Sequence, residues 1–197
     1  MSTESFLILH GIGNHRLPEH WQFWIAGRRR DRGHQVLYPG LPEPDTPSYL
    51  EWASALDDNL AAMEGDRRTV IAHSLACLLW MRRADGLDPR RRVNRLLLVS
   101  PPANEQVPSP GAAFLVEAIN ADAVHASASD EIRIVCSDND PYNPAGASQL
   151  YAGPLGCPVN TLPGVGHITP DEGYGRWPSL EAWCRGATRE LRADGSS

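Results

Sequence analysis

Short, strongly apolar runs alternate along the chain with longer segments whose apolar residues recur at helical spacing. The runs Phe6–Leu9 and Leu96–Val99 contain no polar residues, which is typical of strands that helices cover on both faces. This alternation predicts βα units arranged around a mainly parallel sheet. We expect about six strands, at Phe6–His10, Gln35–Tyr38, Thr69–His73, Arg95–Ser100, Ile132–Ser137 and Pro158–Leu162.

The segments between these runs predict helices. In Glu19–Arg32 the apolar residues share one face, and a second helix is expected to open at Pro47 with Thr46 as its N-cap. We predict a three-layer α/β/α sandwich in which the second strand lies outside the first strand and the third strand packs on its other side. The remaining helical segments are residues 74–84, Ala112–Asn120 and Pro178–Leu191, with a short turn at Ala145–Tyr151.

The 197 residues fit one domain, 1–197, and are enough to bury a substantial core. Between the fourth and fifth strands, the proline-rich segment Pro101–Pro110 predicts a loop, and no insertion there is long enough for a helical lid domain. An open active site is therefore expected. We also expect the tail Ala193–Ser197 to be frayed.

Charge and composition exclude several functional classes. The net charge is −6, which disfavours nucleic acid and anionic membranes as partners. The chain has no lysine, so Schiff-base chemistry and P-loop phosphate transfer are excluded. No apolar run approaches the ~18 residues needed to span a bilayer. The N-terminal segment also lacks the pattern of a signal peptide. A cytoplasmic protein is expected, while its oligomeric state stays open.

The most informative motif is Ala72-His73-Ser74-Leu75-Ala76, where an apolar strand passes directly into a helix at a serine. This pattern is typical of a nucleophile elbow, in which the serine hydroxyl projects above the sheet. Alanines stand at the two positions that hold glycines in the G-x-S-x-G pattern. Alternatively, Ser74 is simply the N-cap of the following helix.

A glycine-rich turn follows the first strand at His10-Gly11-Ile12-Gly13. An acyl-transfer site needs two N–H donors for its oxyanion, and we expect the main-chain groups of Leu75 and Ile12 to supply them. A dinucleotide-binding loop is the alternative, but the third glycine of that motif is missing.

A serine nucleophile needs a base, and His167 in Gly164-Val165-Gly166-His167 follows the last predicted strand, at the catalytic edge of an α/β sheet. Asp138 and Asp140 follow the fifth strand, and we favour Asp140 as the carboxylate that orients His167, since Pro141 holds it in an extended conformation. The order Ser74, Asp140, His167 matches the Ser…Asp…His order of α/β-hydrolases.

These motifs, together with His20-Trp21, Trp52 and Ser137-Asp138-Asn139-Asp140-Pro141-Tyr142, resemble the retinoblastoma-binding protein 9 / YdeN family of small serine hydrolases over nearly the whole chain. The resemblance implies a compact α/β-hydrolase fold without a lid and a triad on Ser74, Asp140 and His167. That family often has glycine at the position of Ala76, and the extra methyl group is expected to crowd the elbow.

We therefore expect a serine hydrolase, esterase-like, that cleaves a small-molecule carboxylic ester, lactone or thioester through an acyl-serine intermediate without cofactor or metal. His15, Pro101 and Phe114 are candidate substrate-binding residues because they follow strands that border the site. Two alternatives stay open: a non-catalytic binding or interaction protein with this fold, or a biosynthetic enzyme that uses the triad for acyl transfer or elimination.

Overall fold

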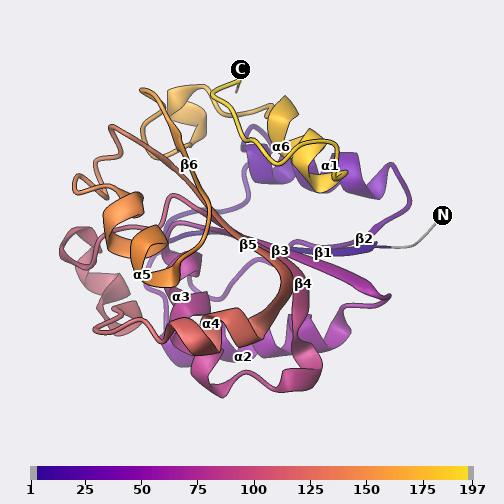
Figure 1. Ribbon diagram of the computed structural model, residues 1–197, viewed down its shortest axis with the longest axis horizontal. Helices are drawn as coiled ribbons and strands as arrows, with labels where there is room; N and C mark the ends of the chain where they lie inside the picture. The colour runs from indigo at the N-terminus through magenta and orange to yellow at the C-terminus, as the bar shows by residue number, and fades with distance from the viewer. Residues whose placement is uncertain (1–3, 195–197) are drawn as a thin grey trace.

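The computed structural model describes residues 4–194, and its centre is a six-stranded sheet in which every pair of neighbouring strands is parallel (Figure 1). The strand order is β2-β1-β3-β4-β5-β6, so β2 and β3 lie on opposite sides of β1, as predicted. The strands are β1 (Glu4–Leu9), β2 (Gln35–Leu37), β3 (Arg67–His73), β4 (Val93–Val99), β5 (Ala128–Ser137) and β6 (Val159–Leu162).

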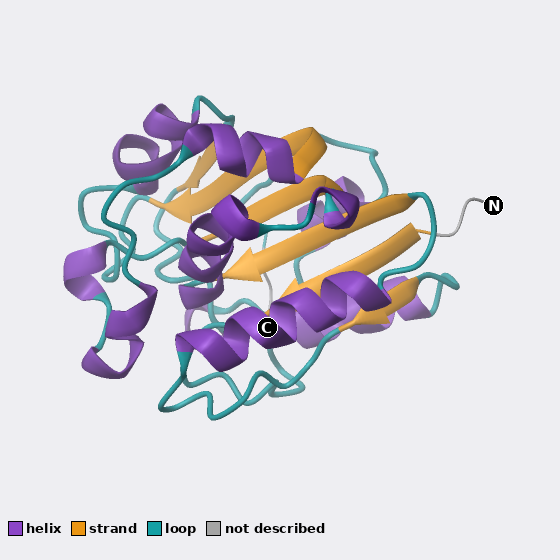
Figure 2. Ribbon diagram, turned by 90° about the horizontal axis from the view of Figure 1, so that it is seen from below, coloured by secondary structure: helices purple, strands orange, loops and turns teal. Residues whose placement is uncertain are grey.

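Helices cover both faces of the sheet, which confirms the three-layer α/β/α architecture of an α/β-hydrolase fold (Figures 1 and 2). Figure 1 shows α1 and α6 on one side and α2, α3 and α4 on the other. The helices are α1 (Trp21–Arg30), α2 (Tyr49–Ala62), α3 (Leu75–Arg83), α4 (Ala121–Ser127), α5 (Gly153–Leu155) and α6 (Pro178–Cys184). Short 3-10 helices occur at Ala84–Gly86, Pro89–Arg91, Asn104–Gln106, Ser109–Phe114 and Pro170–Glu172, and a π-helix at Ser148–Ala152.

The two sheet faces form two separate parts of the core. In β1, Leu7 and Leu9 pack with α2 and α3, whereas Phe6 and Ile8 pack with α1 and α6. All four side chains are fully buried. Burial on both faces explains why the apolar runs in the sequence do not alternate with polar residues.

Helix α2 begins later than predicted. Its N-cap is Ser48, whose hydroxyl accepts from the main-chain N–H of Glu51, so the expectation of Thr46 as the cap before Pro47 was wrong. Both residues are hydroxyl-bearing N-cap types, and the sequence does not reveal which one turns the chain.

The helix predicted over Ala112–Asn120 was also wrong. A 3-10 helix over Ser109–Phe114 occupies the first part, and α4 starts at Ala121 behind Asn120, whose side chain accepts from the N–H of Ala123. Asn is a strong N-cap residue and here begins a helix that we expected it to end.

Helix α6 ends at Cys184 instead of Leu191, because Gly186 adopts a left-handed conformation (φ 70°) and turns the chain. Of the tail expected to be frayed, residues 195–197 lie outside the described part. Asp194 is held in place by hydrogen bonds from Ser179 at 2.7 and 3.0 Å. Among the described residues, no helix is long and apolar enough to cross a membrane.

Candidate active site

Ser74 occupies a strained turn between β3 and α3. Its backbone has φ 56° and ψ −124°, a conformation that side-chain-bearing residues rarely adopt and that persists only where the surrounding structure holds it. The main-chain N–H of Ser74 donates to the carbonyl of Val99 on β4 at 2.9 Å. The Ser74 hydroxyl makes no capping bond to α3, so the alternative of a plain N-cap was wrong.

The hydroxyl instead forms a chain of hydrogen bonds with a histidine and an aspartate. Ser74 Oγ lies 2.9 Å from His167 Nε2, and His167 Nδ1 lies 2.9 and 3.0 Å from the two carboxylate oxygens of Asp140. All three residues are buried, and the Asp140 carboxylate also accepts from the N–H of Tyr142 at 2.9 Å. This arrangement requires Nδ1 of His167 to carry the proton and leaves Nε2 as an acceptor for the serine proton.

A ladder of hydrogen bonds joins the loop after β5 to the loop that contains His167. The side chains of Ser137–Asn139 accept from the main-chain N–H groups of Gly164–Gly166, one residue to one residue. The bonds run from Gly164 to Asp138 (2.7 Å), from Val165 to Ser137 (3.0 Å) and from Gly166 to Asn139 (2.8 Å). Asp138, the second candidate for the triad acid, therefore holds the loop, whereas Asp140 contacts the imidazole.

The turn after β1 lies directly against the serine. A Cβ at Gly11 would come 2.7 Å from Ser74 Cβ, so glycine is needed there for the two loops to approach. His10 fixes the turn: its Nε2 accepts from the N–H of Leu41 at 2.9 Å, and its Nδ1 therefore donates to the Gly11 carbonyl at 2.8 Å. Ile12 and Leu75, the residues expected to form the oxyanion hole, both line the cleft beside Ser74.

Two further buried histidines surround His167. The His73 ring lies 5.1 Å from the His167 ring and 5.6 Å from the His20 ring, and His73 Nε2 donates to the His167 carbonyl at 3.0 Å. Burial, followed by neighbouring histidines, lowers the pKa of His20 to about 4, and the same causes lower the pKa of His73. Both rings are therefore neutral at neutral pH.

A cleft of about 450 Å³ opens above these residues and includes Pro102, Val107 and Tyr142 in its walls. The Tyr142 ring lies 4.5 Å from the His167 ring and is 42% exposed. Ala76, where a crowded elbow was expected, is fully buried, and the Ser74–His167 distance is that of an ordinary hydrogen bond.

The three predicted substrate-binding residues do not line this cleft. His15 is exposed and pairs with Asp45 at 3.1 Å. Phe114 is fully buried in the core against Trp52, at a ring distance of 5.1 Å. The Pro101 carbonyl is held by Asn143, and it is Pro102 that faces the cleft. These predictions assumed that neighbouring positions in a loop face the same way.

The sequence analysis did not assign His73, Tyr142 or the Asp138 ladder a role at the site. Each lies next to a predicted triad residue in the chain, and that proximity was the signal that could have found them. Its weakness is that main-chain acceptors and donors, which the sequence does not distinguish, decide most of these contacts.

The fold and the site together define an α/β-hydrolase with a serine at its nucleophile elbow. The chain belongs to the serine hydrolase family, whose family model matches residues 6–185. It is 24% identical to YdeN of Bacillus subtilis (strain 168) over 179 residues, which cover 89% of this chain and 92% of that protein. These matches support the YdeN part of the resemblance and not the retinoblastoma-binding protein 9 part.

Solved structures share the fold. The ydeN gene product of B. subtilis superposes with a TM-score of 0.81 at 21% identity and covers 94% of this chain and 98% of its own. A YdeN-like protein of Pectobacterium atrosepticum gives 0.70 at 19% identity, covering 93% and 90%. Polyneuridine aldehyde esterase gives 0.62 at 12% identity, covering 92% and 97%.

Proposed function

We propose that the protein hydrolyses a small carboxylic ester, lactone or thioester through an acyl-Ser74 intermediate. The observation behind this proposal is the unbroken hydrogen-bond chain from Ser74 Oγ through His167 to Asp140, at the wall of an open cleft. A hydroxyl in this setting is activated as a nucleophile by the adjacent base.

In the first half of the reaction, Ser74 Oγ attacks the substrate carbonyl carbon while His167 Nε2 takes the serine proton. The carbonyl oxygen becomes an oxyanion, which the N–H groups of Ile12 and Leu75 stabilise. The tetrahedral intermediate then collapses: the bond to the alcohol or thiol breaks, and the leaving group receives the proton from His167. Asp140 stabilises the imidazolium throughout.

In the second half, His167 takes a proton from water, and the resulting hydroxide attacks the acyl-serine carbonyl. The second tetrahedral intermediate expels Ser74 Oγ, which regains its proton from His167, and the carboxylic acid leaves. The cleft opens to solvent, so water reaches the intermediate without a conformational step.

The relatives are consistent with this proposal. The family is one of serine hydrolases. The similar structures include proteins named as a polyneuridine aldehyde esterase and as carboxylesterases of Nitrososphaera gargenis. An ester or a close analogue is the substrate class that these names share.

Labelling with a fluorophosphonate probe, followed by turnover of p-nitrophenyl acetate, tests the proposal. The parent protein should label once, at Ser74, and a folded Ser74→Ala variant should neither label nor exceed the background rate. A folded parent that resists the probe would favour the non-catalytic alternative. A labelled parent that transfers its acyl group to an added alcohol, without releasing acid, would favour acyl transfer.

A further inference from the structure

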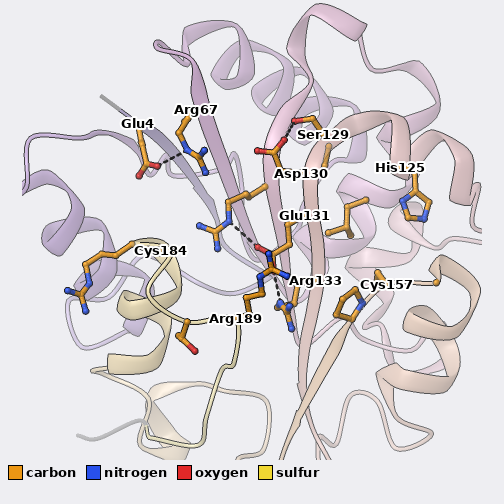
Figure 3. Close-up of a pocket in the computed structure, with 18 residues that line it drawn as sticks. Glu4, Arg67, His125, Ser129, Asp130, Glu131, Arg133, Cys157, Cys184 and Arg189 are labelled. Carbon is orange, nitrogen blue, oxygen red and sulfur yellow. Dashed lines mark hydrogen bonds and ion pairs between the residues drawn. The ribbon is translucent and has the colours of Figure 1, made fainter. Parts of the chain in front are cut away.

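A second and larger hollow lies at the opposite edge of the sheet from Ser74. Its volume is about 640 Å³, and its walls come from the amino-terminal ends of β3, β4 and β5 and from the segment after α6 (Figure 3). Drug-sized ligands occupy cavities of this order. The proposed hydrolase reaction does not use this hollow, since Ser74 and His167 lie at the carboxyl ends of the strands.

The hollow is positively charged in a protein that is negatively charged overall. Three acidic side chains, Glu4, Asp130 and Glu131, face five guanidinium groups. The whole chain has a net charge of −6. The guanidinium groups are those of Arg67, Arg95, Arg133, Arg185 and Arg189.

The deepest part of this cluster has more positive than negative charge. Arg95 and Arg133 are each 8% exposed and share one carboxylate, that of Glu131, at 3.1 and 2.8 Å. Burial alone would raise the pKa of Glu131, but its bonds to Arg133 and Arg95 hold that pKa below its ordinary value. Glu131 therefore contributes one negative charge against two positive charges. Burying an unbalanced charge is costly unless a counter-charge is near.

Hydrogen-bond donors remain free on these arginines. Arg95 uses Nε for Glu131 and Nη2 for the Trp183 carbonyl, and Arg133 uses Nε for Glu131 and Nη1 for Asn160. One terminal nitrogen of each, Nη1 of Arg95 and Nη2 of Arg133, has no partner among the described residues. At the rim, Arg185 and Arg189 are exposed and form no ion pair within residues 4–194.

We propose that this hollow binds a small molecule with a phosphate or polycarboxylate group. Arg95 and Arg133 contact the anionic group from below, and Arg185 and Arg189 contact it from the rim. Guanidinium groups suit this ligand class because they offer paired N–H donors that match the oxygens of carboxylate and phosphate. A hollow with a buried floor favours a small ligand over an extended acidic peptide.

Isothermal titration calorimetry with pyrophosphate and, separately, with citrate tests the proposal at constant ionic strength. We expect saturable binding of at least one of them with one site per chain. Arg185→Gln and Arg189→Gln should each weaken it by about tenfold, since each removes a charge-assisted hydrogen bond. Binding of pyrophosphate alone would identify a phosphate ligand, and binding of citrate alone a carboxylate ligand.

The matched control is Arg176→Gln, since Arg176 is also exposed but does not line the hollow. Its affinity should equal that of the parent protein, and so should that of Ser74→Ala, which tests binding at the catalytic cleft. Absence of saturable binding at millimolar ligand would overturn the proposal. Equal losses in Arg176→Gln and Arg189→Gln would also overturn it, because they would indicate only general charge attraction.

Discussion

At the scale of single residues, the orientation of the His167 ring depends on the Asp140 carboxylate, which is 2% exposed and bonds to Nδ1 through both oxygens. In Asp140→Asn the amide can donate to Nδ1, which favours the wrong histidine tautomer while the fold is kept. We expect kcat to fall by on the order of 10⁴, the loss known for the equivalent change in a serine protease. Steady-state kinetics on p-nitrophenyl acetate measure the effect.

Asp138→Asn is the control for this prediction. Asn keeps a side-chain oxygen that can accept from the Gly164 N–H, so the loop ladder survives and the unfolding free energy changes by about 1 kcal/mol or less. Its kcat should stay close to that of the parent protein. If Asp138→Asn lost more activity than Asp140→Asn, Asp138 would be the triad acid.

Gly11 gives a second prediction at this scale. The Cβ of Gly11→Ala would meet Ser74 Cβ at 2.7 Å and Oγ at 3.1 Å, so the serine or the oxyanion turn must shift. A shift of this size should lower kcat by about a hundredfold. The same assay on Gly27→Ala is the control, because an added Cβ there meets nothing within 4 Å in the middle of α1. Undiminished kcat in Gly11→Ala would contradict the packing argument.

The predicted contacts at this scale depended on chain order more than on side-chain direction. Ser74, Asp140 and His167 could be placed together because each follows a strand, and the carboxyl ends of parallel strands meet at one edge. Phe114 could not be placed correctly. Its segment forms a 3-10 helix, which turns the ring into the core against Trp52, and the sequence does not distinguish that helix from an α-helix.

At the scale of elements, α1 begins at a histidine that lies within the active site. His20 is the N-cap, and its Nδ1 accepts from the N–H of Gln22 at 3.2 Å. Its side chain also lines the cleft and contacts His73. The start of this helix and the packing below His167 are therefore coupled through one neutral imidazole.

This coupling makes stability depend on pH. The pKa of His20 is about 4 in the folded protein and 6.5 ordinarily, so between these values the unfolded chain binds a proton that the folded protein does not. The free energy of unfolding should therefore fall as pH drops from about 7 to about 4, with a contribution from His20 on the order of 3 kcal/mol. His20→Asn keeps an N-cap acceptor without the titrating ring, and urea unfolding at both pH values should show a smaller fall.

The exposed His15 is the matched control for the pH series. His15→Asn should show the same loss of unfolding free energy between the two pH values as the parent protein. An equal loss in His20→Asn would mean that the buried ring does not cause the acid sensitivity.

Elements with strong patterns were predicted well, and those defined by one capping residue were not. All six strands and the order of β2, β1 and β3 agree with expectation, because continuous apolar runs demand burial on both faces. The start of α4 at Asn120 and the end of α6 before Gly186 depend on single hydrogen bonds or one left-handed residue. Such local choices leave a weak trace in the sequence.

At the scale of the whole molecule, charge is divided between the two edges of the sheet. None of the 18 arginines lines the catalytic cleft, whereas five line the hollow at the other edge. The cleft instead has three carboxylates in its walls, Glu19, Asp171 and Glu172. Glu172 is bonded to the N–H of Thr169, while Asp171 is exposed and makes no ion pair among residues 4–194.

If the proposed hydrolysis is correct, this field should select against anionic substrates. A negative cleft lowers the local concentration of an anionic ester and opposes its binding. We expect kcat/KM for p-nitrophenyl hexanoate to exceed that for the mono-p-nitrophenyl ester of adipic acid by about tenfold, and the ratio to shrink at high salt as the charges are screened. Asp171→Asn should raise the rate for the adipate ester and leave the hexanoate rate unchanged. Asp58→Asn, an exposed change on α2 that does not border the cleft, should alter neither rate. A preference for the adipate ester would show that the carboxylates do not control access to Ser74.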